Sequence, residues 1–203
     1  MLGNQEEIKN WKDALSELRE GTPLETPTPL FKKLDLKDIV GESDPFSRLD
    51  LRVAKIIDVQ DHPQADKLYV MQVDLGPLGK RTIVAGMKPY YPKEEILGKM
   101  IVLVTNLKPA TIRGVESKGM LLAAGDSTGA VVLLTPKESS PGAEVGVENI
   151  PREPVSVLEY AAFKEVVMTT DTKGHIIYNG KPLKSKNHNV VTDKKVKEGA
   201  KIS

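Results

Sequence analysis

FSRLDLRVAKIIDVQDH, residues 46–62, alternates between apolar and polar side chains. A period of two is typical of a strand that buries one face. The apolar side carries Leu49, Leu51, Val53 and Ile56 or Ile57. The outward side carries Arg48, Asp50, Arg52 and Lys55. The alternation falters at Ala54, where we expect a kink in the strand.

Further short strands follow at even intervals. They are predicted over residues 68–75 (LYVMQVDL), 80–85 (KRTIVA), 100–105 (MIVLVT), 120–124 (MLLAA) and 131–136 (VVLLTP). HPQADK and GPLG supply turns, and YYPKEEIL predicts a short helical or turn segment. Counted from the strand at residues 46–62, the first five of these strands, with a short helix between the third and fourth, follow the order of the OB-fold. We therefore predict a mainly β protein with a five-stranded OB-fold barrel over residues 46–147.

The connection after MIVLVT is NLKPATIRGVESKGMLLAA, residues 106–124. It carries three basic side chains, two small hydroxyl groups and two glycines, which are Lys108, Arg113, Lys118, Thr111, Ser117, Gly114 and Gly119. These groups suit contact with phosphates, and they include no nucleophile–base pair for bond cleavage. A basic, glycine-containing loop between two strands is how small β-barrels present themselves to nucleic acid.

Two other regions flank the predicted barrel. Residues 1–45 contain a helical pattern over 5–19, a stiff proline-rich linker, TPLETPTPL, and a segment at 31–40 that could be a helix or a docking strand. This region is either a solvated tail or a joint to another catalytic body. Residues 148–203 contain a brief helical pattern over 156–168 and a hairpin at Asn179-Gly180. So small a unit folds poorly alone, and we expect it to pack on the barrel as a C-terminal β-rich extension.

Composition limits the class of protein. Of the 203 residues, 39% are apolar, which is enough for a core, and only 4% are aromatic, which excludes a surface of many stacking platforms. The absence of cysteine excludes disulfides and thiolate zinc sites, and it fits a reducing compartment. No apolar run reaches membrane-spanning length, and the start of the chain does not resemble a secretory or transit signal. We predict a cytoplasmic protein without a membrane segment.

The net charge of +1 hides an uneven layout. Residues 1–45 hold 6 basic and 10 acidic side chains, residues 46–145 hold 13 and 11, and residues 146–203 hold 10 and 7. The excess of positive charge in the last two regions is small. Affinity for nucleic acid must therefore come from placed residues, and it should be moderate and sensitive to salt.

Three motifs over residues 46–147 resemble a known family. They are SRLDLRVAKIIDVQDHPQADKLYVMQVDLG, RTIVAGM and NLKPATIRGVESKGMLLAA, in this order. In them the chain is similar to the tRNA-binding domain of the methionyl-tRNA synthetase C-terminal and endothelial monocyte-activating polypeptide II family. YNGKPLK at 178–184 resembles the C-terminal extension of polypeptide II, and residues 14–35 resemble the tail of a methionyl-tRNA synthetase body. Ala54 departs from the glycine found there in many relatives.

The resemblance implies a non-catalytic module that binds tRNA by shape and backbone, as a C-terminal domain or subunit of methionyl-tRNA synthetase, with no cofactor or metal. A synthetase body, or other synthetases, would be its protein partners. The implied tRNA-binding residues are Asn106, Lys108, Arg113, Ser117 and Met120, with Arg48, Arg52, Arg81 and Lys118 as further candidates. In this family the extension occupies the place of a second barrel, which predicts a monomer with pseudo-dimer architecture.

Several of these residues have a simpler interpretation. Asn106 could cap the turn after a strand, Met120 could begin a buried strand, and Lys108 and Arg113 could be solvated charges. His62 and Asp66 have a spacing compatible with a metal, but a pair without a third ligand is usually turn chemistry. The lysines of the third region either extend the RNA surface or keep it soluble; they are Lys181, Lys184, Lys186, Lys194, Lys195 and Lys197.

At the level of function, one other class competes with tRNA binding. A protein-binding scaffold or chaperone could use the same barrel. The basic loop of residues 106–124 favours RNA over a protein partner.

Overall fold

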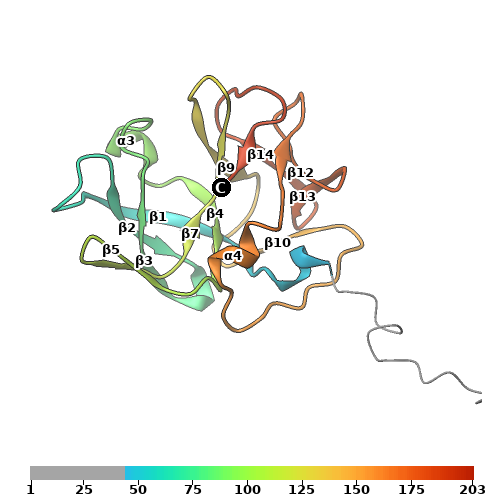
Figure 1. The fold of residues 1–203 in the computed structure, drawn as a ribbon, viewed down its shortest axis with the longest axis horizontal. Coiled ribbons are helices and arrows are strands. Elements are labelled where there is room, and N and C mark those ends of the chain that lie inside the picture. Colours follow the sequence, from blue (N-terminus) through green and yellow to red (C-terminus); the bar gives the residue numbers. More distant parts are fainter. Residues whose placement is uncertain (1–43) are drawn as a thin grey trace, which may run out of the picture. The chain divides into compact units, whose positions relative to one another are not determined.

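Residues 44–203, which the computed structural model describes, are mainly β (Figure 1). Their helical parts are two short α-helices, α3 (Lys93–Ile96) and α4 (Tyr160–Phe163), and two 3-10 turns, η1 (Pro45–Arg48) and η2 (Gly76–Leu78). The helix predicted over residues 5–19, the proline-rich linker and the segment 31–40 lie outside the described residues. Within residues 44–203, no helix is long and apolar enough to cross a membrane.

The first strand, β1 (Leu51–Asp61), organises the barrel. It pairs in antiparallel fashion with β2 (Tyr69–Asp74), β4 (Met100–Val104) and, at its start, β10 (Glu144–Val147). β2 continues through η2 into β3 (Lys80–Ala85), which confirms the hairpin predicted at GPLG. Leu51, Val53 and Ile56 of β1 are buried as predicted, but not on one side: Leu51 and Val53 belong to one apolar cluster and Ile56 to another.

The kink predicted near Ala54 is wrong. Ala54 keeps a regular register opposite Ile101 of β4, and its side chain is buried. The irregularity lies between Ile56 and Asp58, where Ile57 is the extra residue against β2. A bulge of this kind bends a strand and increases its twist.

The strands close into a barrel through the connection that follows β4. β4 pairs with β7 (Met120–Leu121), and the backbone N of Lys118 donates to the carbonyl of Thr82 on β3 over 2.9 Å. The side chains inside the barrel form a buried cluster that includes Met71, Ile83 and Leu103. α3 lies between β3 and β4, as predicted.

The predicted count of five strands is not confirmed. The strand predicted over residues 120–124 is divided into β7 and β8 (Ala123–Gly125). The strand predicted over residues 131–136 is present as β9 (Val131–Pro136). These short strands reach different partners, because β7 pairs with β4, β8 with β15 (Lys201–Ile202), and β9 with both β8 and β14 (His188–Thr192).

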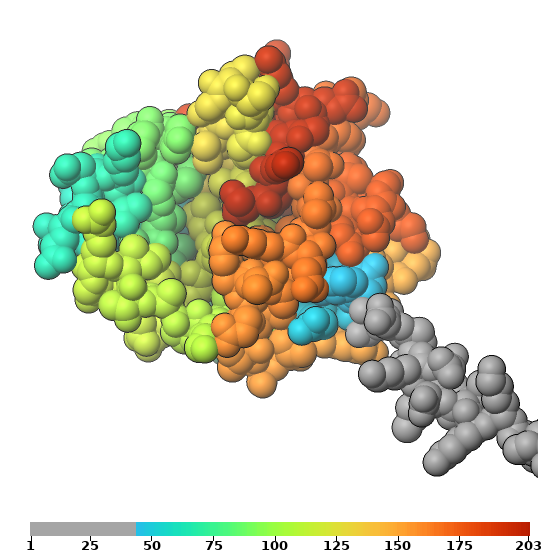
Figure 2. All heavy atoms as spheres, viewed as in Figure 1, coloured from blue at the N-terminus to red at the C-terminus, as the bar shows by residue number. Residues whose placement is uncertain are grey.

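The segment after β10 forms an extension whose strands pair with those of the barrel. Besides β14 and β15 it holds β11 (Thr169–Thr170), β12 (Ile176–Tyr178) and β13 (Lys181–Ser185), and β13 pairs with β10. The hairpin predicted at Asn179-Gly180 joins β12 to β13, with φ of 48° and 75° as a type I′ turn requires. In Figure 2 the orange and red extension packs directly against the green and yellow barrel.

One apolar core joins the barrel to the extension. Buried side chains of β1 and β4 share a cluster with buried side chains of β12, β13 and β14; among them are Leu51, Val53, Val104, Ile176, Leu183 and Val190. At the edge of this core the Tyr178 hydroxyl donates to Asp44 over 2.7 Å. Burial, together with this hydrogen bond, raises the pKa of Tyr178 to about 12.

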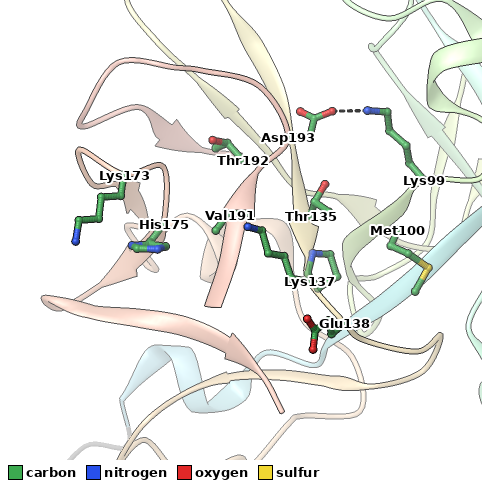
Figure 3. Close-up of a pocket in the computed structure, with 11 residues that line it drawn as sticks. Lys99, Met100, Thr135, Lys137, Glu138, Lys173, His175, Val191, Thr192 and Asp193 are labelled. Atoms are coloured by element: carbon green, nitrogen blue, oxygen red, sulfur yellow. Dashed lines mark hydrogen bonds and ion pairs between the residues drawn. The ribbon is translucent and has the colours of Figure 1, made fainter. Parts of the chain in front are cut away.

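A groove of about 860 Å³ runs between the barrel and the extension (Figure 3). Asp193 of the extension lies on it and accepts hydrogen bonds from the Tyr91 hydroxyl at 2.6 Å, the Lys99 ammonium at 2.7 Å and the backbone N of Leu133 at 3.0 Å. Burial raises the pKa of Tyr91, and the hydrogen bond to Asp193 adds to this effect. Asp193 therefore anchors the extension to three separate parts of the barrel.

Candidate nucleic-acid interface

The basic loop after β4 contains a β-hairpin. β5 (Ala110–Ile112) pairs with β6 (Val115–Ser117) across Arg113 and Gly114, whose φ angles are 45° and 86°. Positive φ at both central residues is the signature of a type I′ turn. Glycine adopts it freely, whereas arginine does so at a cost of roughly 1 kcal/mol. The hairpin was missed in the sequence because arginine occupies the position that asparagine or aspartate normally takes.

His62 fixes the tip of this hairpin against the turn between β1 and β2. Its ring is buried, Nδ1 accepts from the backbone N of Gln64 at 3.1 Å, and Nε2 donates to the carbonyl of Ile112 at 3.1 Å. Both ring nitrogens thus serve the turn chemistry that the sequence left as one alternative for His62. Among residues 44–203, no group of three or more His, Cys, Asp or Glu side chains is arranged to hold a metal ion.

A groove of about 420 Å³ lies between the hairpin and the outer face of β2 and β3. Its lining residues are Gln72, Lys80, Arg81, Thr82, Gly114, Val115, Glu116 and Lys118. Lys80 is exposed at the start of β3, and Gln72 donates to the hydroxyl of Thr82 over 2.7 Å. The groove therefore offers ammonium, amide and hydroxyl groups side by side, which is the chemistry that contacts phosphates and ribose hydroxyls.

Three of the predicted residues are exposed basic side chains on or beside the hairpin. Arg113 is exposed at its tip. The side chain of Lys118 is 54% exposed and lies 3.2 Å from Glu116, and that of Lys108 is 63% exposed and lies 2.8 Å from Glu159. The hydrogen bond to Glu159 raises the pKa of Lys108. Exposed ion pairs of this kind contribute little to stability, so both lysines can exchange their carboxylates for phosphates.

Asn106 is buried at the base of the loop and is occupied by the protein itself. Its amide nitrogen donates to the carbonyls of Arg48 and Val155, each at 2.9 Å, and its amide oxygen accepts from the backbone N of Asp50 at 3.0 Å. These bonds connect the chain just before β1, the base of the loop and the extension. Asn106 accordingly positions the loop, close to the capping role that was the alternative for it.

Ser117 and Arg52 are also held by internal contacts. The buried hydroxyl of Ser117 donates to the carbonyl of Gly119 and accepts from the backbone N of Val84, each at 3.0 Å. The guanidinium of Arg52 lies 2.7 Å from Asp50 and 3.1 Å from Glu144, with the side chain 19% exposed. Ser117 closes the barrel against β3, and Arg52 belongs to a carboxylate network.

The other predicted residues are half-buried. Arg81 donates to the carbonyl of Thr105 at 2.6 Å while it lines the groove, so it both braces the loop and adds charge to the groove. Met120 packs against the shared apolar core at the start of β7, in line with the alternative of a buried strand. Arg48 ends η1, where its carbonyl accepts from Asn106.

Sequence reasoning did not select Lys80 or Glu159, and it considered His62 only for turn chemistry or a metal pair. Lys80 and Thr82 were within reach, because outward positions of a strand alternate and both face away from the buried Ile83. Glu159 could not be found, since it lies far from Lys108 in the sequence and only the docked extension brings it there.

A family model described as "Putative tRNA binding domain" matches residues 51–144. The methionine–tRNA ligase of Pyrococcus horikoshii is 55% identical over 102 residues, which cover 50% of this chain and 14% of that ligase. The cytoplasmic tyrosine–tRNA ligase of Xenopus laevis is 46% identical over 110 residues, which cover 53% of this chain and 21% of that ligase. The chain thus spans only a small part of the length of these relatives.

A solved structure extends the similarity of the fold beyond the matched domain. The crystal structure of the C-terminal domain of Plasmodium vivax p43 has a TM-score of 0.70 to this protein at 24% identity, covering 78% of this chain and 98% of that domain. At this identity the likeness concerns the fold, which includes residues outside 51–144. Residues 51–144, which match the tRNA-binding domain model, form most of the barrel and carry the basic hairpin.

Proposed function

We propose that this protein binds tRNA by its shape and backbone, without catalysis, and raises the tRNA affinity of a methionine–tRNA ligase to which it is joined or bound. The observation that carries the proposal is that three basic side chains, Lys108, Arg113 and Lys118, are exposed on or beside the hairpin that follows β4 of the closed barrel. The hairpin stands beside the groove where Lys80 is exposed.

The chemistry of this surface favours backbone contacts over reading of bases. Its charged donors suit phosphates, and the Arg113 guanidinium can form two hydrogen bonds to one phosphate. Paired RNA hides its base edges in a deep, narrow groove, so general binding of tRNA must use phosphates and 2′-hydroxyls. Similarity to ligases for two different amino acids, methionine and tyrosine, supports a role that does not distinguish tRNA species.

Joined to a ligase, such a module would act through effective concentration. A second binding site on the same assembly holds tRNA near the catalytic body and tightens overall binding without new specificity. The extension pairs with the barrel through β13, β14 and β15, which cover strands that a second barrel could otherwise meet. This supports a monomer with pseudo-dimer architecture. A cytoplasmic location follows from this partnership and is part of the proposal.

A filter-binding titration with mixed tRNA at low salt tests the function. We expect salt-sensitive binding that the double substitution Lys108→Ala and Arg113→Ala weakens at least tenfold. Since each lost phosphate contact reduces the slope of log K against log salt by about 0.7 to 0.9, the double variant should lose about 1.5 from the slope.

The matched control is the pair Lys137→Ala and Lys201→Ala, which removes the same charge from exposed lysines away from the hairpin. It should bind tRNA within about twofold of the unmodified chain. Absence of tRNA binding at low salt, or equal losses in both double variants, would overturn the proposal and leave a protein-binding scaffold as the remaining class.

A further inference from the structure

The extension contributes its own side chains to the basic loop. The backbone N of Leu158 donates to the carbonyl of Asn106 at 2.7 Å, and the backbone N of Lys108 donates to the carbonyl of Leu158 at 3.0 Å. Leu158 thereby forms an isolated parallel bridge with Leu107, which holds residues 158–160 beside the loop. In Figure 2 the orange segment around α4 adjoins the lime-green loop.

Tyr160 begins α4 immediately after this bridge, and it is 50% exposed. Its ring is stacked on that of the buried Phe163, with 6.2 Å between the centroids and 19° between the ring planes. This contact fixes the orientation of the Tyr160 ring. The ammonium of Lys164 lies over the Tyr160 ring, 4.8 Å from its centroid, and a base that stacks on this ring would displace it. Tyr160 is thus an exposed aromatic ring of fixed orientation with a cation over it, in a chain with few aromatic residues.

We propose that Tyr160 stacks on an unpaired base of bound tRNA, while Lys108 and Lys164 contact the phosphates that flank this nucleotide. The inference rests on the proposed function and adds a contact that the match to the tRNA-binding domain model does not suggest, because Tyr160 lies outside the matched residues 51–144. Aromatic stacking accepts any base, so this contact keeps the binding independent of sequence.

The neighbourhood of Tyr160 favours a nucleotide over a protein partner. Val157 and Val167 are exposed nearby in the sequence, at 56% and 64%, and could suggest an apolar docking patch. Tyr160, however, has Lys164 against its ring and follows Glu159, the partner of Lys108. A base with its phosphates satisfies both the ring and the two lysines, whereas an apolar protein surface would bury Lys164 and the Lys108–Glu159 pair at a cost in free energy.

Two RNA probes separate stacking from general attraction: mixed tRNA, and a blunt RNA duplex without unpaired nucleotides. Tyr160→Ala should weaken tRNA binding about tenfold, the loss expected for one stacked base, and leave duplex binding within about twofold. Tyr160→Phe should restore tRNA binding because it keeps the ring. In a Trp11→Phe background, Tyr160→Trp introduces the only tryptophan of the chain, and its fluorescence should be quenched by tRNA and not by the duplex.

The outcomes distinguish this inference from the function on which it rests. If Lys108→Ala with Arg113→Ala weakens tRNA binding and Tyr160→Ala does not, tRNA binding stands and stacking is refuted. If Tyr160→Ala weakens tRNA and duplex equally, stacking on an unpaired base is refuted as well. If the unmodified chain fails to bind tRNA, the proposed function is refuted, and the stacking inference is refuted with it. Unchanged melting temperatures of the Tyr160 variants, expected from its exposed position, show that folding is not the cause.

Discussion

At the scale of single residues, we expect the ion pair between Lys108 and Glu159 to lower the affinity for RNA. Glu159 places a carboxylate 2.8 Å from the lysine that should meet a phosphate. Glu159→Gln removes this competing charge and its repulsion of RNA, and we expect tRNA affinity to rise about two- to fivefold at low salt. Stability should not change, because exposed pairs contribute little.

Glu148→Gln is the matched control, since Glu148 is as exposed as Glu159 and pairs with Lys184 at 3.1 Å, away from the loop. Fluorescence anisotropy with labelled tRNA measures both variants. A Glu159→Gln variant that bound no better than Glu148→Gln would show that Lys108 does not contact RNA.

Residue type alone predicted which charged side chains of the loop are exposed, but it did not predict that the polar side chains Asn106 and Ser117 are held by internal hydrogen bonds. Lys108, Arg113 and Lys118 are exposed where the sequence put them, because charged side chains in a loop have no other stable place. Asn106 and Ser117 carry the same donor and acceptor groups whether they meet RNA or backbone. Their partners, such as Val155 and Val84, come from distant parts of the chain, which a local pattern does not reveal.

At the scale of elements, we expect the Arg113-Gly114 turn to link the stability of the hairpin to its affinity for tRNA. The left-handed backbone at Arg113 is one that asparagine adopts more readily. Arg113→Asn should therefore stabilise the protein by up to about 1 kcal/mol and weaken tRNA binding, because the guanidinium is lost. Arg113→Lys keeps the charge and the strain, so its stability should stay and its affinity should fall less.

Thermal unfolding and tRNA titration of both variants test this coupling. The expectation is contradicted if Arg113→Asn lowers the melting temperature, or if it binds as well as Arg113→Lys. The first result would mean that the turn needs the arginine, and the second that the charge at the tip does not meet RNA.

The elements that the sequence predicted well are those with a local cause. The hairpin at Asn179-Gly180 follows from turn residues that require no outside support. The helix expected over 156–168 is present only as α4. It begins later than expected because the bridge between Leu107 and Leu158 holds the preceding chain extended. The strand predicted over residues 120–124 is divided into β7 and β8 for a similar reason. β7 pairs with β4 of the barrel, whereas β8 pairs with β15 of the extension, which local patterns do not place.

At the scale of the whole molecule, barrel and extension form one folding unit. They share an apolar core, three strand pairings and the buried contacts of Asp193. The same docking presents Glu159 and Tyr160 to the loop. We therefore expect stability and RNA binding to be linked through the contacts between the barrel and the extension.

Asp193→Ala tests this link. The side chain is only 8% exposed, and its removal leaves the Leu133 N–H and the Tyr91 hydroxyl without this acceptor and the Lys99 ammonium without its closest partner. Loss of such contacts costs about 2–4 kcal/mol, which lowers the melting temperature of a domain this size by on the order of 5–15 °C. Asp193→Asn keeps an acceptor for Tyr91 and Leu133, so its loss should be smaller.

Glu198→Ala, an exposed acid of the same extension, should leave the melting temperature unchanged. Calorimetry should give a single transition for the unmodified chain, because a core shared between the two parts cannot be exposed on one side alone. Two separate transitions, or an Asp193→Ala variant as stable as Glu198→Ala, would mean that the extension docks weakly. Tyr160 and Glu159 would then not be held beside the loop in solution, and the composite RNA surface would have to be assembled by the tRNA itself.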